Sequence, residues 1–311
     1  MFTPLFILKV FPILLTSYIK EETKMKKWGF LLVFALFLVF IFKILPISRD
    51  KVEYQLYEQN DNTAIENSQK IEITEEQIHQ GNLLLVNSEY DVQQAGIQSD
   101  IISLFTHNEL NTGYQLLNNE IKLSEEIVEK FSEMIAAAEE DGVSNFLISS
   151  GYRDFDEQNR LYKEMGADYA LPAGHSEHNL GLALDVGSTQ MKMKEAPEGE
   201  WIEENSWKKG FILRYPANKT DITGIQYEPW HIRYVGLPHS AIMQGMNLAL
   251  EEYLDYLKEE KSISISVEGK KYTISYYPIS QNGTIEVEVP ANEQYEISGN
   301  NIDGVIVTTL N

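Results

Sequence analysis

The sequence predicts an α+β fold, in which helices flank a small mixed or antiparallel sheet, with one transmembrane helix before it and a small β appendage after it. Three observations lead to this prediction. A helical period that ends at a glycine occurs twice in the middle of the chain, and short apolar runs between and after these helices predict strands. One long apolar run lies near the N-terminus. From residue 261 onward, apolar and polar residues alternate in short runs separated by turn residues.

Composition and charge narrow the classes of function. With 311 residues, of which 43% are hydrophobic, the chain can bury one domain of ordinary size and carry smaller appendages. The formal net charge of −22 argues against a nucleic-acid partner, because the phosphate backbone would repel the chain. The absence of cysteine excludes disulfides and thiolate ligands, so any transition-metal site must consist of His, Asp and Glu side chains.

An apolar run at residues 28–47 predicts a membrane-spanning helix within an anchor segment, 25–48. A cleaved signal peptide is the alternative, but no small-residue cleavage site follows Pro46. The charges on either side give little orientation, so the expected function places the rest of the chain on the extracytoplasmic face of the cell membrane. Residues 49–74 are polar and lack sustained periodicity, which is typical of a stalk.

Residues 1–24 precede Met25-Lys26-Lys27, which is how an export segment usually begins. We therefore expect residues 1–24 to be an extension from an upstream mis-start, with Met25 as the native start. A second short membrane segment is the alternative. The intact mass of protein made by its natural host would distinguish the two.

Segment 75–260 is predicted to be the catalytic domain, and residues 261–311 the β appendage. Ser124 can cap a helix that reaches Asp141 and stops at Gly142. A second helix is predicted at 154–165, with Gly166 as its terminator. Strands are expected at 145–149, 182–186 and 231–235, and a last helix is expected to run from Pro238 to about residue 257.

The segment around His178 and Asp185 has the pattern of a metal site. If residues 182–186 form a strand, Asp185 faces away from the apolar residues that alternate with it. Gly181 lets the chain turn so that His178 comes back over the same face. These two residues would supply two of the ligands of a catalytic zinc site, which needs three protein ligands and one open position.

The third ligand is expected to be His231, with Glu228 three residues before it. Pro229 makes this stretch extended rather than helical, which excludes the metalloproteases that use an HExxH helix. Glu228 would take the proton from the attacking water and hand it to the departing amine. The predicted cofactor is one zinc ion.

Arg153 is predicted at a strand-to-helix junction, where its guanidinium fork suits the free carboxylate at the end of a peptide. This favours a carboxypeptidase over an endopeptidase. The other histidines have simpler interpretations: His79, His107 and His239 are expected to be packed or at the surface, while His175 stays open as an alternative ligand.

Taken together, these residues resemble the zinc D,D-peptidase family that includes the vancomycin-resistance dipeptidases and carboxypeptidases. The family pattern S-x-H-x-x-G-x-A-x-D is met from Ser176 to Asp185, and E-x-x-H is met from Glu228 to His231. The SGYR segment at 150–153, followed by Glu157-Gln158, resembles the family's substrate-binding arginine and its companion glutamine. The apolar anchor, polar stalk and β tail resemble VanY-type carboxypeptidases over nearly the whole chain.

The resemblance implies the fold of D-Ala-D-Ala carboxypeptidases and Hedgehog-like zinc peptidases. It implies metal ligation by His178, Asp185 and His231, catalysis by Glu228, and substrate contacts from Arg153, Gln158 and Ser176. It also implies that the enzyme removes the terminal D-Ala of peptidoglycan precursors outside the membrane, which lowers the glycopeptide target and contributes to vancomycin resistance.

Three alternatives remain at this point. An L,D-carboxypeptidase or a peptidoglycan endopeptidase would use the same metal machinery. A catalytically silent cell-wall-binding module would keep the groove, but would have no need for Glu228 beside three ligands. A serine peptidase would need S-x-x-K with companion motifs, and the only such tetrad, Ser206 to Lys209, has none.

Overall fold

The computed structural model describes residues 55–57, 68–166, 170–280, 283–291 and 294–311, which all lie in one compact unit, Val52–Asn311. The predicted extension 1–24, the predicted anchor 25–48 with its apolar run 28–47, and most of the predicted stalk lie outside the described residues. Among the helices that the structure describes, none combines the length and the apolar character that a membrane crossing requires. The membrane segment therefore stays a prediction.

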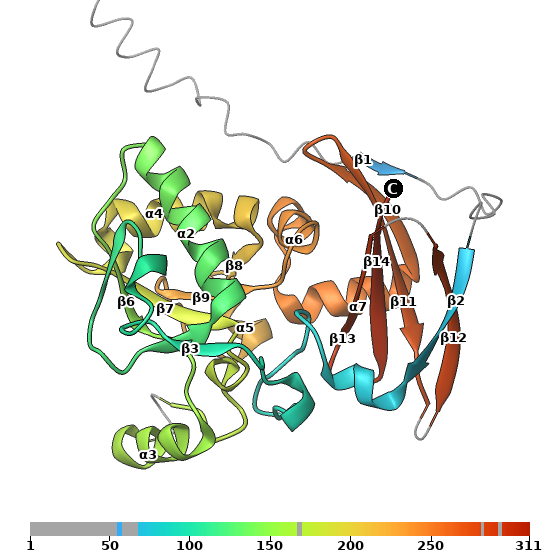
Figure 1. The fold of residues 1–311 in the computed structure, drawn as a ribbon, viewed down its shortest axis with the longest axis horizontal. Helices are drawn as coiled ribbons and strands as arrows, with labels where there is room; N and C mark the ends of the chain where they lie inside the picture. Colours follow the sequence, from blue (N-terminus) through green and yellow to red (C-terminus); the bar gives the residue numbers. More distant parts are fainter. Residues whose placement is uncertain (1–54, 58–67, 167–169, 281–282, 292–293) are drawn as a thin grey trace, which may run out of the picture. The chain divides into compact units, whose positions relative to one another are not determined.

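A sheet of five strands forms the centre of the predicted catalytic domain (Figure 1). Its strands lie in the order β4 (Tyr114–Leu116), β6 (Phe146–Ser150), β7 (Ala183–Ser188), β9 (His231–Tyr234) and β8 (Phe211–Leu213). β4 and β6 run parallel and the other neighbours run antiparallel, so the predicted mixed sheet is confirmed. Three of the strands were predicted within one or two residues; β4 and β8, at three residues each, are too short for a pattern to reveal.

Helix α2 (Glu125–Glu140) packs its apolar stripe against this sheet. The hydroxyl of Ser124 accepts a hydrogen bond from the backbone N–H of Ile127, which caps the helix as predicted. Phe131 is fully buried, with its ring edge-on to those of Tyr114 and Phe211 at centroid distances of 5.0 Å and 6.4 Å. These contacts tie the helix to both edge strands of the sheet.

Helix α3 (Phe155–Met165) follows β6 and is capped by Asp154, whose carboxylate accepts from the backbone N–H of Glu157 at 2.8 Å. It ends at Gly166, as predicted. The remaining short elements of this part of the chain are the antiparallel pair β3 (Ile101–Ser103) and β5 (Lys122–Ser124), and the helices α4 (Pro197–Asn205) and α5 (Thr220–Thr223).

The single last helix predicted from Pro238 is wrong, because the structure has two helices there, α6 (His239–Met246) and α7 (Leu250–Glu260). Asn247 adopts a left-handed conformation with φ of 53°, which ends α6. A new helix then starts after Ala249, whose backbone N–H donates to the carboxylate of Glu252 at 2.8 Å. The apolar period continues across the break, so the pattern did not reveal it.

The predicted β appendage is present, but residues before the core domain complete it. It contains β10 (Ser262–Val267), β11 (Lys270–Pro278), β12 (Thr284–Pro290), β13 (Tyr295–Gly299) and β14 (Gly304–Leu310). β1 (Gln55–Tyr57) pairs with β10, and β2 (Ser68–Thr74) pairs with β12, both antiparallel (Figure 1). We call these seven strands the β lobe.

The expectation of a polar stalk therefore does not hold for residues 55–57 and 68–74. The physical reason lies in β2, where Ile73 is fully buried and packs in an apolar cluster with Val287 and Val289 of β12. A short strand with two alternating isoleucines gives little signal by itself, and its partner lies more than 200 residues away in the chain.

Candidate active site

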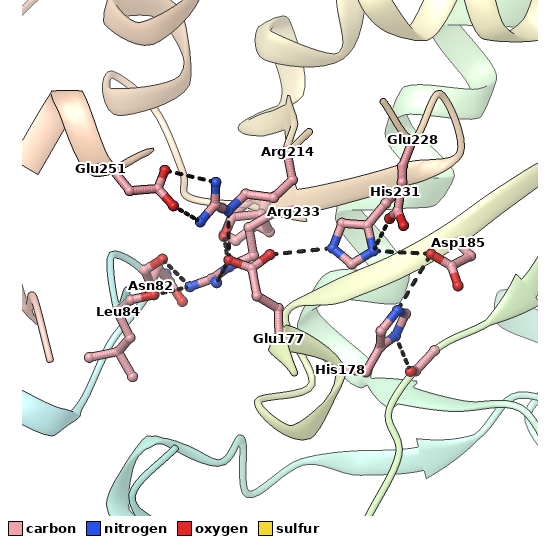
Figure 2. Close-up of polar contacts among 12 residues, drawn as sticks. Asn82, Leu84, Glu177, His178, Asp185, Arg214, Glu228, His231, Arg233 and Glu251 are labelled. Carbon is pink, nitrogen blue, oxygen red and sulfur yellow. Dashed lines mark hydrogen bonds and ion pairs between the residues drawn. The ribbon is translucent and has the colours of Figure 1, made fainter. Parts of the chain in front are cut away.

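The three predicted metal ligands come together beside the central sheet (Figure 2). Asp185 of β7 lies directly opposite His231, the first residue of β9. His178 lies in a short 3-10 turn, Glu177–Asn179, just before β7. One ligand atom from each residue lies within 4.8 Å of the others, so two imidazoles and one carboxylate are placed to share an ion.

The turn between His178 and β7 depends on Gly181, as the sequence predicted. Its φ of 87° is in the left-handed region, and a Cβ atom there would lie 2.5 Å from Cδ1 of Ile101. Nδ1 of His178 lies 2.7 Å from the backbone carbonyl of Gly151, to which it donates. Because Nδ1 is used in this hydrogen bond, Nε2 is the nitrogen that faces the other two predicted ligands. It lies 3.4 Å from Oδ1 of Asp185.

The charges of the three ligands follow from their surroundings. Burial, helped by the Arg153 guanidinium, lowers the pKa of His178 to about 4, so that it is neutral at pH 7. Burial disfavours the charged form of Asp185, but His178 and His231 outweigh it and hold the carboxyl pKa well below its usual range. Burial also opposes charge on His231, but its hydrogen bonds to Asp185 and Glu177 raise its pKa to about 9. A metal must therefore displace a proton from His231, which makes metal affinity fall as the pH decreases.

Glu228 lies next to this group, with its Oε2 at 4.0 Å from Nδ1 of His231. Its side chain is 29% exposed, and burial raises its pKa, partly offset by His231. A carboxylate with a raised pKa accepts a proton more readily near neutral pH. The stretch that contains Pro229 is not helical, in agreement with the prediction that excluded an HExxH helix.

Arg153 reaches the same place from the junction between β6 and α3. Its backbone N–H donates to the carbonyl of His178 at 3.1 Å, and its carbonyl accepts from the side chain of Asn179 at 2.7 Å. Arg153 and Asp185 both line a cavity of about 390 Å³. Nε of Arg153 is shielded from solvent and has no hydrogen-bond partner among the described residues. A guanidinium with an unpaired N–H beside the predicted metal ligands is suited to bind an anion.

Two predicted substrate contacts do not line this cavity. Gln158 is buried in α3 and donates from Nε2 to the carbonyl of Leu171 at 2.7 Å, which supports the loop before His178. Its Oε1 has no partner among the described residues. Ser176 is 6% exposed and occupies the N-cap position of the turn that carries His178. Their contacts to substrate stay predictions.

The other histidines have structural contacts. Nδ1 of His175 lies 2.8 Å from the carbonyl of Asn87, and His175 is not part of the ligand group. His79 and His107 lie within hydrogen-bond distance of Asn301 and the Ser103 carbonyl, respectively. His239 is buried between Tyr253 and Thr308.

The sequence analysis missed Glu177, a fully buried carboxylate beside His231 (Figure 2). Its Oε1 accepts from Nε of Arg214 and from a guanidinium NH of Arg233, both at 2.8 Å. Arg214 also forms a two-pronged ion pair with Glu251 of α7, at 2.9 Å and 2.7 Å. Both arginines stand within or directly after short strands, HIRY and FIL, and their burial, which calls for a buried carboxylate partner, is evident only in the structure.

A second, mostly apolar cavity of about 580 Å³ adjoins the first, since Ser149 lines both. Met191 and Trp230 contribute exposed apolar surface to it, and Lys192 and Lys194 stand among its lining residues.

Comparison with known proteins agrees with this geometry. The family model for VanY, D-alanyl-D-alanine carboxypeptidase, matches residues 120–237, a range that includes all of the predicted site residues. A D-alanyl-D-alanine carboxypeptidase from Enterococcus faecium is 62% identical over 296 residues, which cover 92% of this chain and 97% of that protein. The chain belongs to the D-alanyl-D-alanine carboxypeptidase family.

Two solved structures of vancomycin-resistance enzymes are similar to this chain to different degrees. The vancomycin-resistance D,D-dipeptidase VanXYg, in complex with a D-Ala-D-Ala phosphinate analogue, is 30% identical with a TM-score of 0.69, covering 78% of this chain and 99% of that one. A mutant vancomycin-resistance D,D-pentapeptidase VanY in complex with Zn(II) is 31% identical with a TM-score of 0.46, covering 56% of this chain and 98% of that one. The first of these confirms the predicted zinc D,D-peptidase type of fold.

Proposed function

We propose that this protein is a zinc D,D-carboxypeptidase that hydrolyses the C-terminal D-Ala from peptidoglycan pentapeptide precursors and so contributes to vancomycin resistance. One observation carries the proposal: Arg153, whose Nε has no hydrogen-bond partner among the described residues, lines the same cavity as Asp185 of the His-Asp-His group. A free C-terminal carboxylate would satisfy this cation and place the last peptide bond next to the ligand group.

His178, Asp185 and His231 would hold the zinc ion. Their donor set fits, since two imidazole nitrogens and one carboxylate leave a fourth position open, as in other catalytic zinc sites. When bound, zinc supplies Lewis acidity, which polarises a carbonyl group and increases the acidity of water. His178 and Asp185 already have the neutral and anionic forms that ligation needs at pH 7.

Glu228 is the proton carrier in this proposal. It accepts the proton of the attacking water at its carboxylate and delivers it to the amine of the departing D-Ala. Arg153 binds and orients the terminal carboxylate, which holds the scissile carbonyl in place during this transfer. Gln158 and Ser176 are proposed as further substrate contacts on the strength of the family pattern alone.

The deciding experiment uses the full chain and a muramyl pentapeptide that ends in D-Ala-D-Ala, with D-Ala release followed in the presence and absence of a chelator. We expect release that chelation stops, that zinc restores and that Glu228→Ala lacks. Cleavage of a tetrapeptide or of a cross-linked peptide, but not of the pentapeptide, would favour an L,D-carboxypeptidase or an endopeptidase. Zinc binding without any cleavage would favour a silent wall-binding module.

We also propose that residues 28–47 anchor the enzyme in the cell membrane as a single-pass segment, with the catalytic domain on the extracytoplasmic face. The apolar run and the location of peptidoglycan substrates support this proposal. Because the chain has no cysteine, a single Glu129→Cys on the exposed side of α2 gives an unambiguous label site. Labelling of intact cells by a membrane-impermeant maleimide is expected, and labelling only after lysis would contradict the orientation.

A further inference from the structure

The imidazole of His231 has a different partner on each nitrogen (Figure 2). Nδ1 lies 3.1 Å from Oδ1 of Asp185, while Nε2 lies 3.3 Å from Oε2 of Glu177. An ion shared with Asp185 would bind Nδ1, because that is the nitrogen next to the carboxylate. Nε2 is then left to carry the ring proton, and Glu177 is the group that accepts it.

Glu177 is itself held on its other oxygen. Oε1 accepts from Arg214 and Arg233, both at 2.8 Å, and the side chains of all three residues have no exposed surface. Arg233 also donates to the backbone carbonyls of Asn82 and Leu84, each at 3.1 Å. With Oε1 fixed in this way, Oε2 contacts His231 alone among the residues that the structure describes.

The charges in this cluster balance without His231. Two arginines, Arg214 and Arg233, face two carboxylates, Glu177 and Glu251. An ion at Nδ1 would take the lone pair of that nitrogen, so the ring proton would lie on Nε2, where Oε2 of Glu177 can accept it. Arg233 stands two residues after His231 on β9, so the same face of one strand presents both the ligand and part of the clamp.

We propose that Glu177, clamped by Arg214 and Arg233, is a positioning residue that fixes the ring orientation and the tautomer of His231 for metal binding at Nδ1. The inference rests on the proposed zinc site. A partner of this kind behind a ligating histidine typically changes metal affinity by roughly tenfold to a hundredfold. We expect a loss of that size when the carboxylate is removed.

The test measures zinc affinity of the full chain by competition with a chromophoric chelator. The variant Glu177→Gln is combined with Arg233→Met, which removes one negative and one positive charge so that the buried cluster stays balanced. Glu198→Gln is the matched control, because Glu198 is a buried carboxylate of α4 outside the ligand group. The zinc Kd should rise roughly tenfold to a hundredfold in the double variant and stay unchanged in the control.

A second measurement reports the tautomer directly. In zinc-loaded protein with ¹⁵N-labelled histidine, NMR should detect a protected proton on Nε2 of His231 in the wild type and its rapid exchange in the double variant. If the double variant does not fold, Glu177→Asp replaces it, since a shorter carboxylate keeps the charge but withdraws from Nε2. The expected results are again a raised zinc Kd and a faster exchange of the Nε2 proton.

Each outcome is decisive. An unchanged zinc Kd together with an unchanged Nε2 proton, in whichever Glu177 variant folds, would overturn the positioning role and leave the proposed zinc site intact. Equal zinc binding by the wild type and by His178→Ala would instead overturn the proposed metal site, and this inference with it.

Discussion

Arg153 offers a test that separates function from stability. Replacing it with methionine removes a guanidinium that would form two charge-assisted hydrogen bonds to the terminal carboxylate of the substrate. Each hydrogen bond to a charged group contributes about 1.5–3 kcal/mol, so the loss of two corresponds to a loss of roughly 10²-fold to 10⁴-fold in kcat/KM. The free protein should not suffer, because Nε of Arg153 has no described partner and burial lowers its pKa. We therefore expect a melting temperature equal to or above that of the wild type.

The assay compares D-Ala release from the pentapeptide with thermal unfolding for the same preparations. Arg160→Met is the matched control, because Arg160 lines the same cavity from an exposed position on α3, where solvent screens its charge. It should reduce kcat/KM much less than Arg153→Met. A melting temperature that falls in parallel with activity would show that Arg153 is a structural cation, and unchanged activity would show that it does not bind the carboxylate.

Three further predictions concern the site, helix α6 and the core. Glu228→Gln should lower kcat by roughly 10²-fold to 10⁴-fold, since it removes the proton acceptor. The zinc Kd of this variant should stay within a few-fold of the wild type in a chelator competition. A large loss of zinc affinity would mean that Glu228 is a ligand. Burial lowers the pKa of His239 to about 3, whereas an unfolded histidine titrates near 6.5. The unfolded chain therefore binds the extra proton, so the stability due to neutral His239 is complete above about pH 6.5 and is lost as the pH falls toward 3. His239→Gln should reduce the slope of unfolding free energy against pH between 6.5 and 4.5 by up to about 1.4 kcal/mol per pH unit, and an identical slope in denaturant titrations would refute this. Phe131→Ala should cost about 3–5 kcal/mol in the same titrations, because it empties a fully buried contact between α2 and both sheet edges; a cost below about 1 kcal/mol would mean that the core closes over the gap.

Elements whose signals lie within their own segment could be predicted from the sequence. Ser124 and Gly142 mark the ends of α2, and Asp154 and Gly166 mark those of α3, because capping involves residues only a few positions apart. The break at Asn247 could not be predicted in this way. Asparagine can adopt the left-handed conformation but does not have to. The apolar residues on both sides of Asn247 keep a helical period, so the sequence pattern predicts one continuous helix.

Pairing between distant segments was beyond the sequence analysis for a different reason. β2 forms its ladder with β12 across the whole core domain, from Ser68 opposite Pro290 to Thr74 opposite Thr284. No local pattern encodes such a partner, since a polar strand of this length is equally compatible with a linker. A shortened chain that begins near Thr74 would therefore lack two strands of the β lobe, β1 and β2, and expose the buried side of Val287 and Val289.

The residues of the candidate site also differ in how far the sequence predicts them. The grouping of His178, Asp185 and His231 was predictable, because the first two share one short segment and His231 lies in a stretch that Pro229 keeps extended. The role of Glu177 could not be predicted, although Glu177 lies next to His178. Its burial depends on ion pairs with Arg214, which follows β8, and with Arg233 of β9. In the sequence alone, a glutamate in a polar segment is expected at the surface.

The register of β7 against β9 explains how the sheet brings Asp185 and His231 together. Leu184 pairs with Ile232, and both are fully buried in the core on one side of the sheet. Side chains alternate along a strand, so the next pair, Asp185 and His231, must lie on the opposite side and next to each other. A slip of one residue would bury the carboxylate in the core and expose the leucine, which costs far more than any strain at the ligands. The packing of the core therefore positions two of the three predicted ligands. His178 is positioned separately, by the turn at Gly181 and by its hydrogen bond to the Gly151 carbonyl.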